Sequence, residues 1–283
     1  CRRRGPAVMG GFFYNTNGFA FHRLEDVVPI LAELGYDGVA LTPDVHHLDP
    51  ARSTRKDVLA FRALLERHGL AVIVETGARY VLDPARKHRP SLLDAPVGAA
   101  RRLAFLEQCV TLAHELGAPI VSTWSGSGPE GQSRGEGMER LVVGLRALCE
   151  FADDAGVDIG FEPEPGMAVE RTDEWPEIRE RVAHPRLGLT LDVGHCLATG
   201  EGDPAAILRA HAADLRVLHL DDHRPGVHEH LAFGEGDVEF RAVAQAVRAV
   251  DFEGPLEVEL SRHGSTATTT AAAAIRYLRE IFS

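Results

Sequence analysis

Four acidic or imidazole side chains stand at or near the ends of four short apolar segments in the second half of the chain. The segments read IGFE, LTLD, VLHL and LEVE, and their polar residues are Glu162, Asp192, His219 and Glu259. A strand that is buried on both faces has no use for such a residue unless the residue lies at the strand's end, where a site can form. Three carboxylates and one imidazole form a donor set that suits one divalent cation. The pattern therefore predicts a metal-dependent enzyme site at one mouth of a β/α barrel.

The segments that must position these side chains alternate between strand and helix patterns along the whole chain. The first two helical segments end at Gly35 and Gly69, a usual stop signal, and the second has Ser53 as its predicted N-cap. Strands are predicted at 7–14, 37–42, 70–76, 119–125, 157–162, 187–192, 217–220 and 255–260, and helices at 24–35, 53–69, 97–117, 136–156, 172–182, 203–213, 238–250 and 268–282. Eight such pairs without a leftover element predict an α/β fold, a single (β/α)8 TIM barrel. An open doubly wound sheet is disfavoured because no GxGxxG follows the first strand.

Length and charge restrict the domain organisation and the partners. A chain of 283 residues suits one barrel, and we assign 9–283 to a single catalytic domain. Residues 1–8 have arginines without a following apolar stretch, so we expect a disordered leader rather than a secretory signal. The chain has 30 Lys and Arg against 42 Asp and Glu, a net charge of −12. This balance argues against a nucleic-acid partner, which would need clustered basic residues.

Apolar runs and cysteines bear on the compartment. No apolar run is long enough to span a bilayer, so no membrane association is predicted. The four cysteines include no CxxC pair, and Cys109 and Cys149 fall in helical segments, where a small buried hydrophobe is expected. No disulfide framework is evident, which predicts a reducing compartment and a cytoplasmic location.

Five motifs resemble one group of barrels. GFEPEPG, LDVGHC, VLHLDD, FGEGDVEF and LEVEL follow one another as in the sugar phosphate isomerase/epimerase superfamily, whose members share a xylose isomerase-like TIM barrel. That group includes ketose 3-epimerases, hydroxypyruvate isomerase and inosose dehydratases, and it is related to endonuclease IV. The resemblance extends from about Met9 to the end of the chain, and it implies the same barrel, one resident metal ion and a small-molecule substrate.

The resemblance also implies roles for individual residues. Glu162, Asp192, His219 and Glu259 match the metal ligands, and the two glutamates among them would also transfer protons. Substrate-binding positions are expected at His195, His46, Glu75, Trp124, Asp221 and Arg224. Glu164 remains open between a second pocket acid and a surface anchor, His228 and His230 are similarly ambiguous, and the long loop at 77–96 is either a cover for the site or a solvated connection.

The predicted activity is isomerisation or epimerisation of a sugar, sugar phosphate or cyclitol ketone. Carboxylate-mediated proton transfer would proceed through an enediolate that the metal stabilises. Loss of a β-hydroxyl from the same enolate would instead give a dehydratase of the inosose type. An endonuclease IV-like phosphodiesterase and a non-catalytic binding protein are more remote alternatives. Oxygen-rich ligation favours Mn²⁺ and leaves Mg²⁺, Co²⁺ and Zn²⁺ open. Pairing of related barrels through their outer helices suggests a homodimer.

Overall fold

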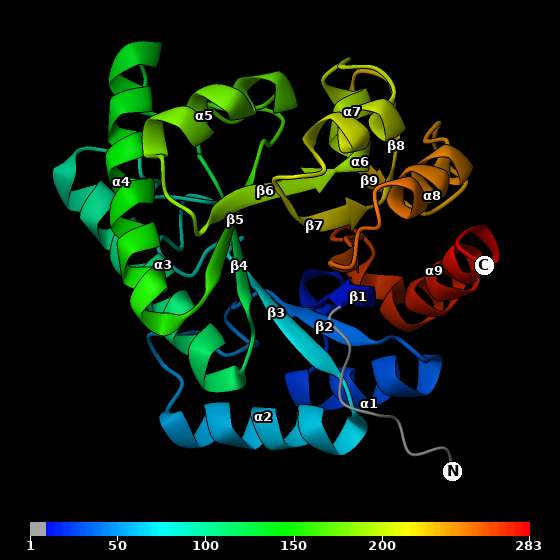
Figure 1. Ribbon diagram of the computed structural model, residues 1–283. Coiled ribbons are helices and arrows are strands. Elements are labelled where there is room, and N and C mark those ends of the chain that lie inside the picture. The colour runs from blue at the N-terminus through cyan, green and yellow to red at the C-terminus, as the bar shows by residue number, and fades with distance from the viewer. Residues whose placement is uncertain (1–9) are drawn as a thin grey trace.

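The computed structural model describes residues 10–283, which form a closed barrel of parallel strands. Around the barrel the strands follow in the order β1-β10-β7-β6-β5-β4-β3-β2, and helices surround them on the outside (Figure 1). The predicted (β/α)8 barrel is therefore confirmed. The leader expected at residues 1–8 lies outside the described residues.

The boundaries of the elements agree with the predicted segments to within a few residues, apart from the additions described below. The barrel strands are β1 (Gly11–Asn15), β2 (Gly38–Leu41), β3 (Ala71–Glu75), β4 (Ile120–Trp124), β5 (Asp158–Glu162), β6 (Leu187–Asp192), β7 (Leu215–Leu220) and β10 (Pro255–Val258). The helices are α1 (Leu24–Leu34), α2 (Arg55–His68), α3 (Pro96–Leu116), α4 (Arg134–Ala155), α5 (Trp175–Val182), α6 (Val193–Ala198), α7 (Pro204–His211), α8 (Phe240–Ala249) and α9 (Ala267–Ile281), with 3-10 turns at Thr16–Phe19, Thr172–Glu174 and Gly264–Thr266. Within residues 10–283, no helix combines the length and apolarity needed to cross a membrane.

Local capping chemistry sets the helix ends. Gly35 and Gly69 adopt the left-handed conformation that closes α1 and α2, as their positions in the sequence predicted. The N-cap of α2 is Thr54 rather than the predicted Ser53. Thr54 and Asp57 form a reciprocal capping box, in which each side chain accepts a hydrogen bond from the other's backbone N–H. Thr54 has an acid, Asp57, three positions later and Ser53 does not, which is why Thr54 is the N-cap.

The interior of the barrel changes from apolar to charged along the strands. Successive inward-facing residues of one strand are two positions apart. On β3, β7 and β1 these pairs are Ile73 then Glu75, Val217 then His219, and Phe13 then Asn15, and all six side chains are buried. The apolar layer at the amino ends of the strands consists of Phe13, Ala40, Ala71, Ile73, Ile120 and Val217. The polar residues therefore lie together at the carboxyl end, where barrel enzymes carry their sites.

Two short additions to the barrel were not predicted. The six-residue helix α6 lies between β6 and α7, and an antiparallel hairpin of β8 (Asp222–Arg224) and β9 (Val227–Leu231) lies between β7 and α8. Helix α6 packs against both strands of the hairpin. The expectation of eight strand–helix pairs without a leftover element was wrong at this point. Pro225 and Gly226 supply the turn, with Gly226 at φ 75°. The strands of the hairpin are short and rich in histidine, so they lack the apolar alternation by which strands are recognised.

The described cysteines are buried and free. Cys109 on α3 and Cys149 on α4 are inaccessible to solvent, as expected of small hydrophobes within amphipathic helices. Cys196 lies on α6 and is also buried.

Candidate metal centre

Four side chains converge on one point at the carboxyl end of the barrel. Glu162 ends β5, Asp192 ends β6, His219 lies on β7, and Glu259 follows β10 by one residue. Nδ1 of His219 lies 3.1 Å from Oε1 of Glu162 and 3.2 Å from Oε2 of Glu259, and Oδ2 of Asp192 is 4.0 Å away. One ligand atom from each residue lies within 4.8 Å of the others. This arrangement of three carboxylates and one imidazole could hold a single divalent cation.

Asp192 has one carboxylate oxygen for the fold and one for the site. Its Oδ1 accepts hydrogen bonds from the backbone N–H groups of Gly194 (2.7 Å) and His195 (2.9 Å), which caps helix α6. Its Oδ2 is buried and has no hydrogen-bond partner among the described residues. A buried carboxylate oxygen without a partner is costly unless it binds a cation. The residue set therefore fits a metal on chemical grounds, and the capping role of Asp192 does not compete with a ligand role.

A second ring of polar groups lies behind His219. Its Nε2 is 3.1 Å from Oε2 of Glu257 and 3.5 Å from Oε1 of Glu75. The other oxygen of Glu257 accepts a hydrogen bond of 2.8 Å from Asn15. With Nε2 directed at Glu257, Nδ1 of His219 lies on the side of the other three candidate ligands, which is the arrangement of metal-binding histidines that have a carboxylate behind them. The sequence-based reasoning missed Glu257, although its place two residues before Glu259 in LEVEL puts it on the inward face of the same strand.

Burial of so many acids alters their proton affinities. Burial raises the pKa of Glu162 to about 7, against the opposing charge of His219. Burial raises the pKa of Asp192 well above its usual range, and the charges of Asp221 and Glu162 add to the effect. Burial by itself lowers the pKa of His219, but the negative charges of Glu257 and Glu162 have a larger effect and raise the pKa of the imidazole above its ordinary value. These carboxylates hold protons that a cation would displace.

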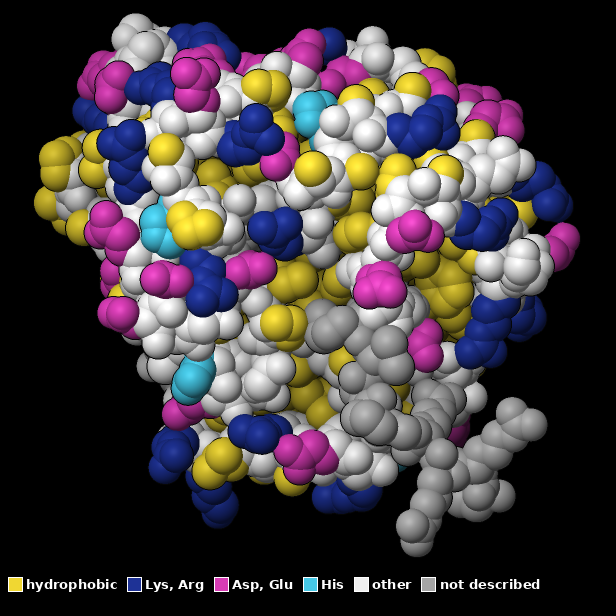
Figure 2. All heavy atoms as spheres, in the orientation of Figure 1, with side chains coloured by type: hydrophobic (Ala, Val, Ile, Leu, Met, Phe, Trp, Pro, Cys, Tyr) yellow, Lys and Arg dark blue, Asp and Glu magenta, His cyan; other side chains and the backbone are white. Residues whose placement is uncertain are grey.

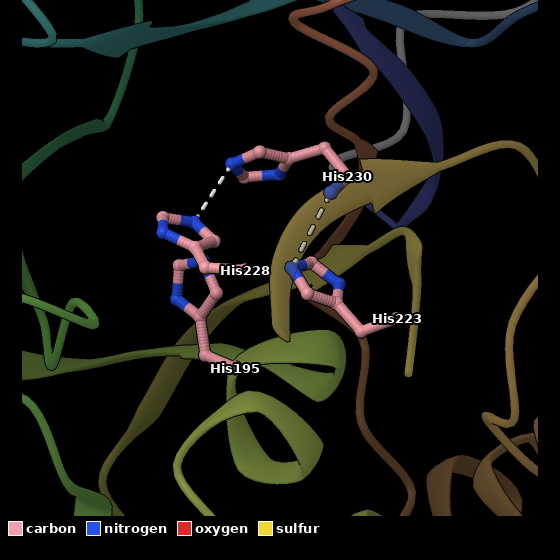
Figure 3. Close-up of side chains that lie close together, drawn as sticks. All are labelled: His195, His223, His228 and His230. Carbon is pink, nitrogen blue, oxygen red and sulfur yellow. Dashed lines mark hydrogen bonds between the residues drawn. The ribbon is translucent and has the colours of Figure 1, made fainter. Parts of the chain in front are cut away.

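Four histidines gather beside this centre. His195 comes from α6, His223 from β8, and His228 and His230 from β9, and one ring nitrogen of each lies within 4.8 Å of the others (Figure 3). Nε2 of His228 lies 3.0 Å from Nε2 of His230. Both ring nitrogens of His195 are buried without a hydrogen bond. The predicted substrate-binding residue His195 therefore links the two clusters, with its Nδ1 3.5 Å from Glu162. The group of four could itself hold a metal ion or protons.

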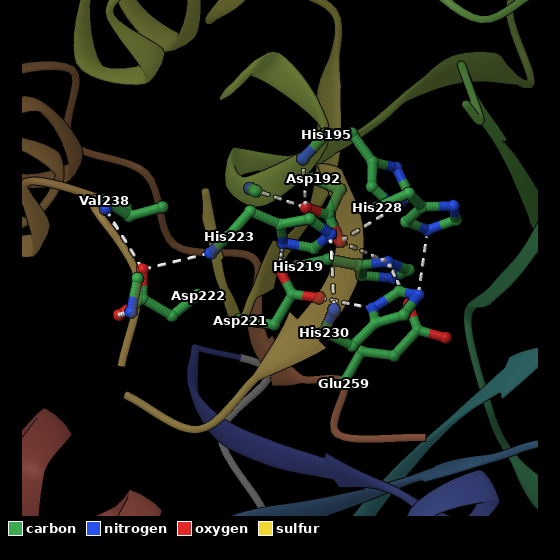
Figure 4. A network of polar contacts seen from close by, with 12 residues as sticks. Asp192, His195, His219, Asp221, Asp222, His223, His228, His230, Val238 and Glu259 are labelled. Atoms are coloured by element: carbon green, nitrogen blue, oxygen red, sulfur yellow. Dashed lines mark hydrogen bonds and ion pairs between the residues drawn. The ribbon is translucent and has the colours of Figure 1, made fainter. Parts of the chain in front are cut away.

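The buried carboxylate of Asp221 contacts two of these histidines. Its carboxylate contacts Nδ1 of His230 and lies 3.2 Å from Nδ1 of His223 (Figure 4). Burial alone would lower the pKa of His230, but Asp221 raises it to about 10. Asp221 does not line the cavity described below, so in this structure it supports the site rather than facing a ligand. An added Cβ at Gly194 would collide with His223 and Asp221, which explains why LDVGHC has glycine there.

The neighbouring Asp222 holds the FGEGDVEF segment in place. Its carboxylate accepts hydrogen bonds from the backbone N–H groups of Gly234 (2.8 Å), Gly236 (2.9 Å) and Val238 (3.0 Å). Figure 4 shows the last of these bonds at the edge of the network. This motif therefore supports the hairpin, a role that no pattern in the amino-acid sequence indicates.

A cavity of about 390 Å³ opens above the candidate ligands, a size common for small-molecule sites. Glu162 and Glu259 form part of its floor, and the predicted substrate-binding residues Glu75 and Trp124 also line it. Glu164, whose role was open, lines it as well and lies 3.7 Å from Nδ1 of His195. The remaining lining residues are Asn15, Thr42, Gly77, Arg79, Lys87, His88, His228, His230, Ser261 and Arg262.

Four predicted substrate-binding residues do not line this cavity: His195 and Asp221, which lie in the neighbouring histidine cluster, and His46 and Arg224. His46 is exposed in the loop after β2, and it is its neighbour His47 that is buried, with Nε2 3.0 Å from the carbonyl of His22. Arg224 is on the hairpin, where its guanidinium pairs with Glu229 at 3.0 Å and its side chain is 54% exposed. Neither His46 nor Arg224 lines the cavity in this conformation, and their role in substrate binding stays a prediction.

The fold and the site together define an eight-stranded parallel barrel with a candidate metal centre at the carboxyl end of its strands. The family model for the xylose isomerase-like TIM barrel matches residues 28–281, so the chain belongs to that family. The predicted family resemblance is therefore confirmed.

Relatives within the family have different activities. An inosose dehydratase of Geobacillus thermodenitrificans is 27% identical over 164 residues, covering 51% of this chain and 55% of the relative. An L-ribulose-5-phosphate 3-epimerase of Shigella flexneri is 23% identical over 206 residues and 72% of each chain. Identities at this level indicate kinship without fixing a substrate.

Solved structures show the same fold. A D-allulose 3-epimerase from Methylomonas sp. has a TM-score of 0.77 at 17% identity, covering 98% of this chain and 100% of its own. The IolI protein, whose structure contains a bound zinc atom, has a TM-score of 0.76 at 18% identity, covering 96% of this chain and 98% of its own.

Proposed function

We propose that the protein is a divalent-metal-dependent isomerase or epimerase that acts on a keto sugar, its phosphate or a cyclitol ketone. The observation that carries the proposal is the placement of Glu162 and Glu259 at 3.1 Å and 3.2 Å from the same nitrogen of His219, on the floor of one cavity. Membership of the family and its epimerase relatives support the same class of reaction.

The two glutamates come from different strands and can approach a bound ligand from different sides. One carboxylate removes the proton from the carbon next to the substrate carbonyl. The other returns a proton to the opposite face of that carbon, which inverts it, whereas return to the neighbouring carbon would interconvert aldose and ketose. A divalent cation held by Glu162, Asp192, His219 and Glu259 would supply polarisation of the carbonyl and stabilisation of the negative charge on its oxygen.

Side chains around the glutamates would hold the ligand and exclude water. Asn17 donates a hydrogen bond of 2.8 Å to Oε1 of Glu259 and so fixes the direction of that carboxylate. Trp124 and His88 pack edge to face, with ring centroids 5.2 Å apart, and form an aromatic part of the wall. Two packed rings leave no room for water on that side of the cavity.

Mn²⁺ is the proposed ion because oxygen donors predominate, and Mg²⁺, Co²⁺ and Zn²⁺ remain alternatives for the same ligands. The buried free cysteines suit the predicted reducing, cytoplasmic setting. The homodimer inferred from related barrels stays a prediction.

A dehydratase is the second candidate, favoured by the similarity to inosose dehydratase. The same proton abstraction would then be followed by loss of a hydroxyl group from the adjacent carbon. Products distinguish the two reactions, since an epimerase gives an isomer with deuterium from solvent and a dehydratase gives a product lighter by one water.

The test combines metal analysis with exchange chemistry. We expect about one equivalent of a divalent metal in the purified protein, and deuterium uptake from D₂O at the α-carbon of ketoses or inososes. Glu162→Gln and His219→Ala should lose or weaken the metal and abolish exchange, because each removes a ligand. Glu33→Gln, which neutralises an exposed acid on α1, is the matched control and should change neither. A protein that binds no metal under any loading condition would contradict the proposal and favour a binding protein.

A further inference from the structure

Three basic side chains line the cavity above the candidate metal ligands. Arg79 and Lys87 belong to the long loop after β3, and Arg262 belongs to the loop after β10. The guanidinium of Arg79 donates a hydrogen bond of 2.8 Å to the carbonyl of Asn17, and that of Arg262 donates one of 2.7 Å to the carbonyl of His228. Both guanidinium groups are therefore held by backbone oxygens at the cavity wall and keep further N–H groups for a ligand.

The three basic side chains in the cavity have no acidic partner within residues 10–283. No ion pair of 4.0 Å or less joins Arg79, Lys87 or Arg262 to a carboxylate in that part of the chain. Arg86, in the same loop as Lys87, instead pairs with Asp83 at 2.8 Å. On the face shown in Figure 2, basic and acidic side chains are likewise interspersed. In a protein of net charge −12, three unpaired cations in one cavity are a local exception.

The acids that share the cavity are occupied elsewhere. Glu75, Glu162 and Glu259 face His219, and Glu164 lies near His195 and His228. A divalent cation held by the candidate ligands would offset two of their three negative charges, and no acid among the described residues lies within ion-pair distance of the three basic groups.

The three basic groups also act on one another. Partial burial lowers the pKa of Lys87, and the charges of Arg79 and Arg262 lower it further, against the opposing charges of Glu164 and Glu259. Like charges close enough to disfavour each other are stabilised by an anion placed between them.

We propose that Arg79, Lys87 and Arg262 form an anion subsite for the phosphate group of a phosphorylated keto sugar. The proposal rests on the proposed function, since it places the reacting carbonyl of that sugar at the metal ligands and its phosphate at the other wall of the same cavity. A phosphate monoester has three terminal oxygens and close to two negative charges, which can meet two guanidinium groups and one ammonium together. A carboxylate has only two oxygens and one charge.

The direct test measures the binding of L-ribulose 5-phosphate and of L-ribulose to the metal-loaded protein by calorimetry. We expect the phosphate ester to bind at least about tenfold more tightly. Arg79→Met, Lys87→Met and Arg262→Met should each reduce that preference, the ratio of the two affinities, about threefold or more. Arg86→Met removes a basic group from the same loop but outside the cavity, and it should leave both affinities unchanged.

A second measurement separates failure of the subsite from failure of the proposed reaction. Inorganic phosphate should raise the thermal stability of the protein more than acetate at equal ionic strength, and the Arg79→Met/Arg262→Met double variant should lose that difference. A preference for acetate, or a phosphate effect that survives the double variant, would overturn the subsite even if the protein exchanges the α-proton of neutral ketoses. Phosphate binding without any deuterium uptake would instead support the subsite and contradict the reaction.

Discussion

The two ends of the barrel interior are built from the same strands but from opposite kinds of side chain. At the amino end, Phe13 and Ile73 pack with alanine, isoleucine and valine in an apolar layer. Two positions further along the same strands, the inward-facing residues are Asn15 and Glu75, which approach His219 and its acidic neighbours. The apolar layer needs only close packing, because its side chains have no hydrogen-bonding atoms. The polar layer leaves buried atoms such as Oδ2 of Asp192 without a hydrogen bond.

This difference separates the parts of the sequence that stabilise the fold from those that serve the site. An apolar layer contributes free energy to folding through burial and close packing. A cluster of buried acids costs free energy unless it is protonated or binds a cation. We therefore expect substitutions at the amino end to change stability and substitutions at the carboxyl end to change metal binding, with little overlap.

The largest effect is expected from Phe13→Ala at the amino end. Phe13 is fully buried, and its ring lies against Gly38, where an added Cβ would collide with it. Removing the ring leaves a cavity, and we expect a loss of about 3–5 kcal/mol in the free energy of unfolding. The metal affinity of the folded protein should stay within about threefold of the parent, because the other layer is untouched. Denaturant unfolding and metal titration measure the two quantities.

Phe21→Ala is the control for that substitution. The side chain of Phe21 is 80% exposed, so its removal should change the free energy of unfolding by no more than about 0.5 kcal/mol. If Phe13→Ala weakened metal binding as much as it weakened folding, the separation between the two layers would be wrong.

At the carboxyl end, Asp192→Asn should lower metal affinity strongly and leave folding stability almost unchanged, the reverse of Phe13→Ala. The amide oxygen of asparagine can still cap α6, but the nitrogen replaces the oxygen that faces the other candidate ligands. We expect metal affinity to fall by about 100-fold or more, the upper end of the range seen when supporting residues alone are removed. The metal-free protein should unfold no more easily, because burial already favours the uncharged acid at this position.

A matched substitution tests the capping argument alone. The carboxylate of Asp203 caps α7 by accepting a hydrogen bond of 2.9 Å from the backbone N–H of Ala205, and the residue does not line the cavity. Asp203→Asn should leave metal affinity unchanged. Equal losses of metal affinity in Asp192→Asn and Asp203→Asn would mean that the centre lies elsewhere.

A smaller effect is expected from Glu257→Gln, which weakens the support behind His219. The carboxylate of Glu257 holds Nε2 of that ring at 3.1 Å, and an amide would hold it without the negative charge. We expect metal affinity to fall about tenfold. A calorimetric titration with Mn²⁺ measures this change, and Glu257→Ala should be worse because it also leaves Asn15 without its partner. An unchanged affinity in both variants would show that the metal does not depend on this contact.

The barrel could be predicted because its signals are local and repeated. Glycines such as Gly35 and Gly69 mark the helix ends, and short apolar runs mark the strands between them. The hairpin that carries His228 and His230 could not be predicted in the same way. Its strands are short and polar, and they are held by contacts with α6 and by the carboxylate of Asp222 rather than by hydrophobic alternation.

The candidate site was predictable to the extent that it lies on strand ends. Glu162, Asp192, His219 and Glu259 come together because parallel strands share one mouth, a property of the barrel as a whole. Residues in loops could not be placed by that reasoning. The exposed positions of His46 and Arg224 depend on how the chain turns after each strand, and the ion pair of Arg224 with Glu229 has no signature in the sequence.

The smallest predicted effect is a pH dependence that the metal should suppress. Burial raises the pKa of Glu75 to about 8 and that of Glu162 to about 7, from an ordinary value of 4.5. Although burial opposes it, Asp221 raises the pKa of His230 to about 10 from 6.5. Above pH 6.5 the folded, metal-free protein therefore holds protons that the unfolded chain has released, so the free energy of unfolding falls as pH rises. Histidines with lowered pKa, such as His195, oppose this trend only below pH 6.5.

We expect the free energy of unfolding of the metal-free protein to fall between pH 6.5 and 8, measured by denaturant unfolding at a series of pH values. The metal-loaded protein should lose less stability or gain some, because a cation binds the deprotonated carboxylates and its affinity rises as they lose protons. Phe13→Ala should shift both curves downward without changing their slopes, since an apolar layer binds no protons. A metal-free stability that stays flat or rises over this range would show that the buried acids at the carboxyl end are not held in their protonated forms, and the contrast between the two ends of the barrel would lose its electrostatic part.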